Sequence, residues 1–187
     1  MHNTYNVELF ISLNTKNIQT VDMDVQNKVA IITGSAQGLG KAFAIRLLDA
    51  GASICLSDVN KVKGEATLQE LQAKYGEKRV GFVPCDVTNE EEFRNLFDKA
   101  EKLFNVDCID ILANNAGINC NAGWRKCMTV NILSVMNGVE IATERMKTSG
   151  KTCQIINTSS LGEIFIYVPT HDCFAFKLHS HPPFTRR

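Results

Sequence analysis

A glycine-rich turn is the feature that most constrains this chain. The segment TGSAQGLG at residues 33–40 lies between an apolar, strand-like run at 28–32 and a helix-like run. Gly34 allows a sharp turn out of the strand, Gly38 allows the backbone to approach a pyrophosphate, and Gly40 allows the helix to pack closely on the strand. The first N–H groups of such a helix face the anion. The turn therefore predicts a phosphate cradle, with ligand-facing positions at Gly34, Gln37, Gly38, Leu39 and Gly40.

An acidic residue follows the next strand-like run. Asp58 directly follows residues 52–57. It lies near the offset of about 20 residues from the glycine turn that is expected for a carboxylate that accepts a ribose hydroxyl of a dinucleotide. Asp58 would repel a 2′-phosphate, and neither Lys nor Arg occurs at 35–37 or directly after Asp58. NAD(H) is therefore favoured over NADP(H), although Lys61 and Lys63 lie close in the sequence.

Spacing excludes a nucleoside triphosphatase P-loop. That motif needs four residues between its first glycine and Gly-Lys, followed by Ser or Thr for magnesium. Here five residues separate Gly34 from Gly40, and Lys41 is followed by Ala42. The glycine turn belongs to another kind of phosphate site.

The composition of the chain limits the classes of partner that it can bind. The 187 residues suffice for one domain with a real core. The formal net charge is zero, which favours neither a nucleic-acid groove nor an anionic membrane. The seven cysteines are odd in number and scattered, a pattern typical of reduced thiols in a cytosolic protein. No Cys/His cluster has zinc spacing. Because the first residues contain no signal-peptide pattern or membrane span, we predict a cytoplasmic protein without a metal.

Strand and helix signals alternate along the chain, which predicts an α/β fold, a Rossmann-type doubly wound parallel sheet. The expected strands are residues 28–33, 52–58, 79–83, 108–113 and 153–157, and a long helix is expected at 124–147. We divide the chain into an N-terminal extension at 1–22 that is a candidate for disorder, a dinucleotide-binding domain at 23–160, and an incomplete catalytic segment with a divergent tail at 161–187.

Four further motifs occur in order along the predicted sheet: CDV at 85–87, NNAG at 114–117, VNI at 130–132 and NTSS at 157–160. With the glycine turn and Asp58, they resemble the short-chain dehydrogenase/reductase family, particularly its NAD-dependent, hydroxyprostaglandin-dehydrogenase-like and insect alcohol-dehydrogenase-like members. The resemblance covers about residues 24–160. It implies an oxidoreductase that moves a hydride between nicotinamide and a secondary alcohol or ketone, with a hydroxylated lipid among the candidates.

The resemblance also implies roles for individual residues. Asp86 and Val87 would border the adenine, while the segment from Asn114 through Ala116 to Gly117, Asn115 included, would stabilise the central sheet and line the cofactor. Asn131 would help to hold a proton-relay water, and Ser160 would orient the substrate oxygen. Taken alone, the same residues also fit an Asx-type loop, a locally bonded helix side chain and a turn serine.

One catalytic position departs from the family pattern. The family uses a tyrosine as proton acceptor, and a lysine four residues later lowers the pKa of that tyrosine and binds the nicotinamide ribose. At the expected spacing this chain has Cys173 and Lys177. A thiol has a reference pKa of about 8.5, but its sulfur lies nearer the backbone than a phenolic oxygen does. Tyr167 follows Ser160 too closely to substitute, and Pro169 opposes a helical turn there.

Family members continue well beyond this lysine, so we interpret the chain as C-terminally truncated. The predicted partners are NAD(H) and a small alcohol or ketone, with a homo-oligomer or a pairing with a full-length relative left open. The alternative is a catalytically inactive dinucleotide-binding or interaction protein that pairs through the helix around residues 125–147. A third hypothesis is a chain that does not fold stably.

Overall fold

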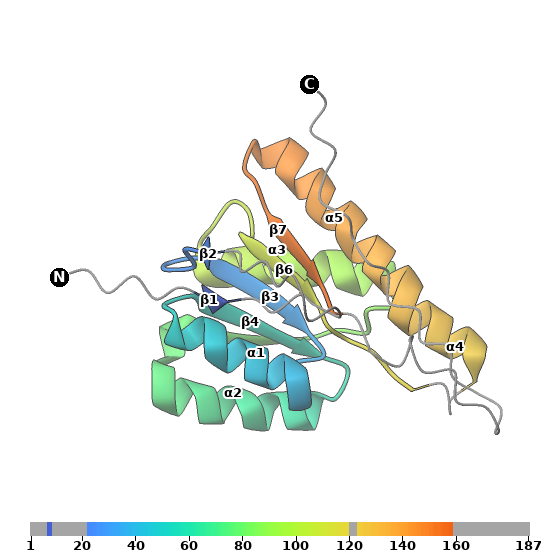
Figure 1. The fold of residues 1–187 in the computed structure, drawn as a ribbon, viewed down its shortest axis with the longest axis horizontal. Helices are drawn as coiled ribbons and strands as arrows, with labels where there is room; N and C mark the ends of the chain where they lie inside the picture. Colours follow the sequence, from blue (N-terminus) through green and yellow to red (C-terminus); the bar gives the residue numbers. More distant parts are fainter. Residues whose placement is uncertain (1–6, 9–21, 120–122, 159–187) are drawn as a thin grey trace, which may run out of the picture.

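A five-stranded parallel sheet forms the centre of the computed structural model, which describes residues 7–8, 22–119 and 123–158 (Figure 1). The strand order is β5-β4-β3-β6-β7. The chain thus starts in the middle of the sheet, moves to one edge, and crosses back beside β3. This arrangement confirms the predicted α/β fold with a Rossmann-type parallel sheet. The strands are β3 (Val29–Thr33), β4 (Ser53–Asp58), β5 (Val80–Pro84), β6 (Ile111–Asn114) and β7 (Gln154–Asn157).

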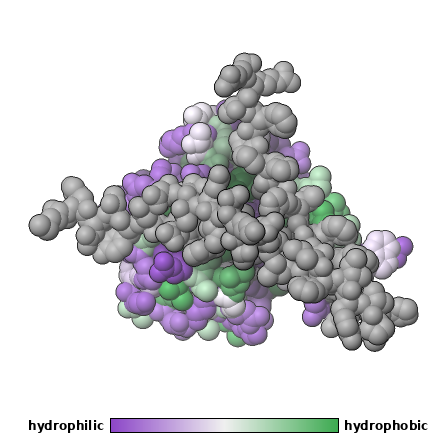
Figure 2. Space-filling model, in the orientation of Figure 1, coloured by the Kyte–Doolittle hydropathy of each residue, from purple (hydrophilic) through white to green (hydrophobic). Residues whose placement is uncertain are grey.

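Helices cover both faces of the sheet. The longer ones are α1 (Gly38–Asp49), α2 (Lys61–Tyr75), α3 (Glu90–Phe104) and α5 (Ser134–Ser149). Shorter segments are η1 (Glu77–Arg79), α4 (Trp124–Met128) and the π-helical η3 (Thr129–Leu133). Hydrophilic residues predominate over α1 and α2 on the face that Figure 2 shows, with small hydrophobic patches between them.

The alternation of side chains along the strands builds two cores. Ala30 and Ile32 of β3 pack with residues of α1 and α2, whereas Val29 and Ile31 pack with residues of α3 and α5. All five residues of β3 are buried. A parallel strand covered on both faces reads as a continuous apolar run, which is why the sequence pattern located β3 and β4 closely.

The two ends of the chain are described only in part. Residues 7, 8 and 22 of the predicted extension belong to β1 (Val7–Glu8) and β2 (Asp22–Met23), which pair in antiparallel register. The tail at 161–187 lies outside the described residues. Among the described helices, none has both the length and the apolar character needed to cross a bilayer. In the same residues, no three His, Cys, Asp or Glu side chains gather as a metal site would require.

The cysteines differ from the expectation at one position. Cys55, Cys85, Cys108 and Cys153 are free thiols, but Cys127 is disulfide-bonded. The prediction of reduced thiols is therefore wrong at Cys127, because scattered spacing along the sequence does not show which sulfurs meet in the fold.

Candidate functional site

The glycine turn after β3 is shaped by close backbone contacts. A Cβ atom at Gly34 would lie 2.7 Å from Cα of Ala116, and one at Gly40 would lie 2.3 Å from the carbonyl oxygen of Gly34. Packing alone therefore requires glycine at both positions. Gly38 is different: its φ is +59°, and a Cβ atom there would meet nothing within 4 Å. The protein leaves the space beside Gly38 free, as the predicted phosphate cradle requires.

The residues between these glycines are held by hydrogen bonds to β3, β4 and α2. The Ser35 hydroxyl donates to the carbonyl oxygen of Ile32 at 2.8 Å. The backbone N–H of Ala36 donates to Oδ2 of Asp58 at 3.1 Å, and its carbonyl accepts from the Thr67 hydroxyl at 2.7 Å. The shape of the turn is therefore set by protein contacts before any ligand arrives.

The start of α1 has the features of an anion site. Gln37 occupies the N-cap position without a side-chain capping bond, and the first turn contains no acidic residue. The first N–H groups of a helix have no partner within the helix, and the helix dipole adds partial positive charge there. In α1 these amides belong to Gly38, Leu39 and Gly40, so they can bind an anion placed beside Gly38.

Asp58 ends β4 next to this turn. Its Oδ1 accepts the backbone N–H of Asn60 at 2.9 Å, while its Oδ2 accepts that of Ala36. An ionised carboxylate oxygen can accept more than one hydrogen bond, so Asp58 keeps acceptor capacity for a further donor. It fixes the turn and can still bind a hydroxyl.

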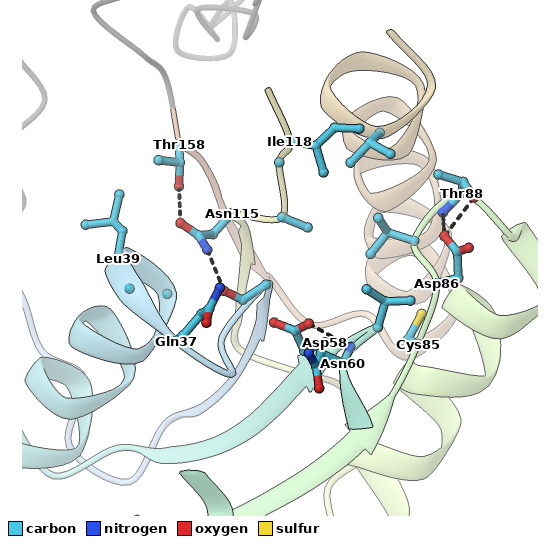
Figure 3. A pocket seen from close by; sticks show the side chains of 18 of the residues that line it. Gln37, Leu39, Asp58, Asn60, Cys85, Asp86, Thr88, Asn115, Ile118 and Thr158 are labelled. Atoms are coloured by element: carbon cyan, nitrogen blue, oxygen red, sulfur yellow. Dashed lines mark hydrogen bonds between the residues drawn. The ribbon is translucent and has the colours of Figure 1, made fainter. Parts of the chain in front are cut away.

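These groups meet at a cavity of about 830 Å³ at the carboxyl edge of the sheet. Figure 3 shows side chains from the glycine turn (Gln37), the end of β4 (Asp58) and the segment after β6 (Asn115) gathered around it. Its size lies within the range of small-molecule and cofactor sites. The predicted residues that line it are Gly34, Gln37, Gly38, Leu39, Gly40, Asp58, Asp86, Val87, Ala116 and Gly117.

Other residues also line this cavity; some belong to the motifs at 85–87, 114–117, 130–132 and 157–160, and the rest were not predicted. Several are direct neighbours of predicted positions, and three come from the long helical segment, where the apolar pattern does not reveal which face meets the cavity. They are Val59, Asn60, Cys85, Thr88, Asn115, Ile118, Lys126, Thr129, Val130 and Thr158. Thr88 orders the predicted Asp86, because its N–H and hydroxyl both donate to Oδ1 of Asp86.

The two adjacent asparagines after β6 have different surroundings. The side chain of Asn114 is buried in the sheet, where its Nδ2 donates to Oδ1 of Asn157 on β7 at 3.0 Å. Asn115 lines the cavity and donates from Nδ2 to the carbonyl oxygens of Thr33 and Gly34, at 2.9 and 3.1 Å. The structure thus does not bring Asn114 to the cavity, and Asn115 ties β6 to the glycine turn instead.

The family model described as short chain dehydrogenase matches residues 28–168 of this sequence. The chain belongs to the short-chain dehydrogenase family. It is 36% identical to the 15-hydroxyprostaglandin dehydrogenase (NAD+) of Macaca fascicularis over 166 residues, which are 88% of this chain and 61% of that protein. It is also 38% identical to the 3beta-hydroxysteroid dehydrogenase 2 of Eggerthella lenta over 143 residues, covering 72% of this chain and 54% of that protein.

Solved structures agree with this assignment. A short-chain dehydrogenase/reductase from Burkholderia phymatum in complex with NAD superposes with a TM-score of 0.70 and 29% identity, over 78% of this chain and 53% of that one. A short-chain dehydrogenase from Mycobacterium smegmatis gives a TM-score of 0.70 at 26% identity, over 80% and 63%. The chain therefore spans between half and two thirds of the length of the relatives compared.

A π-helical segment that contains Asn131 interrupts the helix that the sequence predicts at 124–147. Residues Thr129–Leu133 are π-helical, and Asn131 in this segment is buried. Its Oδ1 accepts the N–H of Ile118, and its Nδ2 donates to the carbonyl oxygen of Ile118, both at 2.9 Å. The side chain thus fixes the backbone at the cavity rim, and π-bulges are frequent at functional sites. The water-holding role of Asn131 stays a prediction.

The remaining predicted catalytic positions of the chain lie outside the described residues. They are Ser160, Cys173 and Lys177, and Tyr167 lies outside as well. The last described residue, Thr158, donates its hydroxyl to Oδ1 of Asn115 at 3.3 Å. The described chain thus reaches the cavity wall two residues before Ser160.

Proposed function

We propose that this chain binds NAD(H) in the cavity at the carboxyl edge of its sheet. The observation that carries the proposal is the free space beside Gly38, bounded by the uncapped start of α1 and by Asp58. The amides of Gly38, Leu39 and Gly40 would hold the diphosphate, and Asp58 would accept a ribose hydroxyl. Two of the relatives support the same cofactor, since one is named as an NAD(+) enzyme and one was solved in complex with NAD.

The adenine would lie between the loop after β5 and the helical segment that follows β6. Asp86, Val87 and Val130 line this part of the cavity. The hydrogen bonds from Thr88 hold Asp86 in a turn. A hydrophobic wall with one ordered polar residue suits a flat heterocycle.

As chemistry we propose hydride exchange between the nicotinamide and a secondary alcohol or ketone, with hydroxylated lipids among the substrates. NAD supplies the hydride acceptor when bound. Asn131, Ser160 and Lys177 are the proposed catalytic residues. A second function, dinucleotide binding without turnover, is favoured by one observation: Cys173 stands where the family pattern has its tyrosine.

The test measures NADH binding by calorimetry and NADH turnover with small ketones and hydroxylated lipids, on one sample of known oligomeric state. Binding with turnover supports the oxidoreductase, and binding without turnover supports the second function. If the folded wild-type chain binds no NADH, both are wrong.

Two glycines provide a matched pair for the binding site. Gly38 and Gly76 both have positive φ, +59° and +94°, and a Cβ atom at either would meet nothing within 4 Å. Only Gly38 lines the cavity. Gly38→Val and Gly76→Val both place a side chain at positive φ, but only Gly38→Val should weaken NADH binding, by about tenfold or more since a lost charged hydrogen bond or two is involved. Equal NADH affinity in the two variants would contradict the proposed cradle.

A further inference from the structure

Lys63 lies where α2 meets the glycine turn. Its Nζ donates to Oε1 of Gln37 at 2.7 Å. The first turn of α2 is fixed by Asn60, whose Oδ1 accepts the N–H of Lys63 at 3.0 Å. The lysine therefore reaches from a capped helix start to a residue that lines the cavity.

The charge of this lysine has only a neutral partner. None of the ion pairs among the described residues includes Lys63. One turn further along α1, Lys41 pairs with Glu70 of α2 at 2.6 Å. An ammonium held by an amide oxygen keeps its full charge and two more donors, so Lys63 can exchange that partner for an anion.

Asp58 and Lys63 both form hydrogen bonds to the glycine turn, at adjacent residues. Asp58 accepts the N–H of Ala36, and Lys63 binds the side chain of the next residue, Gln37. Both Gln37 and Asp58 line the cavity. An acid in this position binds a ribose hydroxyl, and a cation nearby accommodates a phosphate on the same ribose.

We propose that Lys63 is a second determinant of dinucleotide choice, opposed to Asp58. The inference rests on the proposed function, because it requires a dinucleotide in the cavity. With NADH bound, Lys63 stays on Gln37 and braces the turn. With NADPH, Lys63 leaves Gln37 and pairs with the 2′-phosphate, while Asp58 repels it. Asp58 then sets the preference for NAD(H), and Lys63 reduces that preference by its capacity to bind NADP(H).

The test is a double-mutant cycle on binding. NADH and NADPH affinities are measured by fluorescence titration at low and moderate salt for the wild type, Asp58→Asn, Lys63→Met and the double variant. Removing the repelling charge in Asp58→Asn should raise NADPH affinity about tenfold, since one unit charge near a surface phosphate contributes on that order. In the double variant this gain should disappear, and added salt should reduce it in Asp58→Asn.

Two controls separate charge at this site from general effects. Lys61→Met removes the same charge from the same helix turn and should leave the NADPH-to-NADH affinity ratio unchanged. Lys63→Arg in the Asp58→Asn background keeps the cation and should keep the NADPH gain. Thermal unfolding of each variant establishes that the compared proteins are folded.

The outcomes are distinct. If the double variant binds NADPH as tightly as Asp58→Asn does, Lys63 has no part in the choice and the inference is wrong. If Lys61→Met abolishes the gain as Lys63→Met does, the effect is a general field and the inference is wrong as well. If the folded wild type binds neither dinucleotide, the proposed function fails first.

Discussion

The starts of α1 and α3 differ although both helices follow a strand of the same sheet. At α3, Oδ1 of Asn89 accepts the N–H groups of Glu91 and Glu92, at 3.0 and 3.2 Å, and three glutamates occupy the first turn. At α1 the N-cap side chain makes no such bond and the first turn has no acid. Helix starts in proteins are normally satisfied by their own side chains. The first amides of α1 therefore lack a capping side chain and an acidic neighbour, as the proposed diphosphate site requires.

The substitution Gly40→Ala tests the close packing that shapes the start of α1. In Gly40→Ala the new Cβ would meet the backbone oxygen of Gly34 at 2.3 Å, and backbone cannot move aside cheaply. We expect a loss of about 3 kcal/mol in the free energy of unfolding, measured by urea denaturation.

Gly64→Ala is the matched control for Gly40→Ala. Its Cβ would also meet an atom at short range, 2.1 Å, but that atom is the tip of the half-buried Phe82 ring, which can turn away. Alanine is also the better helix former, by about 1 kcal/mol. We expect a near-neutral change, and a loss as large as that of Gly40→Ala would show that the backbone contact at Gly34 is not special.

Alkaline pH tests two buried thiols, one in β4 and one between β5 and α3. Burial raises the pKa of Cys55 in β4 and of Cys85, which precedes α3, to about 12 in each case. The unfolded thiols titrate near 8.5, so between about pH 9 and 12 the folded state binds more protons. Stability is therefore complete below pH 9 and falls as pH rises through this window.

The measurement is the urea midpoint between pH 8 and 10.5, compared between the wild type and Cys85→Ala. The variant should lose less stability across that range. Identical slopes would mean that Cys85 does not contribute to the pH dependence, and rapid modification of Cys85 by a thiol reagent at pH 8 would contradict its raised pKa.

The turn itself can be loosened without touching the glycines. In Thr67→Val the carbonyl oxygen of Ala36 loses the hydroxyl that donates to it at 2.7 Å. A buried acceptor left without its partner costs about 1–3 kcal/mol, and we expect about 1.5 kcal/mol by urea denaturation. NADH affinity should fall as well, because the turn would no longer be ordered before binding.

Thr143→Val is the control for Thr67→Val. Its hydroxyl donates to the carbonyl oxygen of Val139 within α5, which keeps its helical partner when the hydroxyl is removed. It should change neither the unfolding free energy nor NADH affinity by a comparable amount. If Thr67→Val binds NADH like the wild type, the turn does not need this support.

The sequence predicts the sheet and the phosphate end of the site for a physical reason. β3 and β4 are buried on both faces, so their apolar runs predict buried strands. The close packing at Gly34 and Gly40 requires glycine, and these glycines can be recognised in the sequence. The π-helical segment around Asn131 has no such pattern in the sequence, and the Asn131 side chain bonds to Ile118, thirteen residues away. The pattern at 114–117 likewise does not show that Asn115, and not Asn114, meets the cavity.

Alanine substitutions at the two N-cap residues compare the starts of α3 and α1 directly. Asn89→Ala removes a side chain that caps α3 and should cost about 1 kcal/mol in unfolding free energy, with NADH affinity unchanged. Gln37→Ala removes an N-cap side chain that makes no capping bond, so its cost should stay within about 0.5 kcal/mol. It should nevertheless alter NADH affinity, because Gln37 lines the cavity. Were Asn89→Ala to weaken NADH binding and Gln37→Ala to leave it intact, the start of α1 would not be the helix end that is kept open for a ligand.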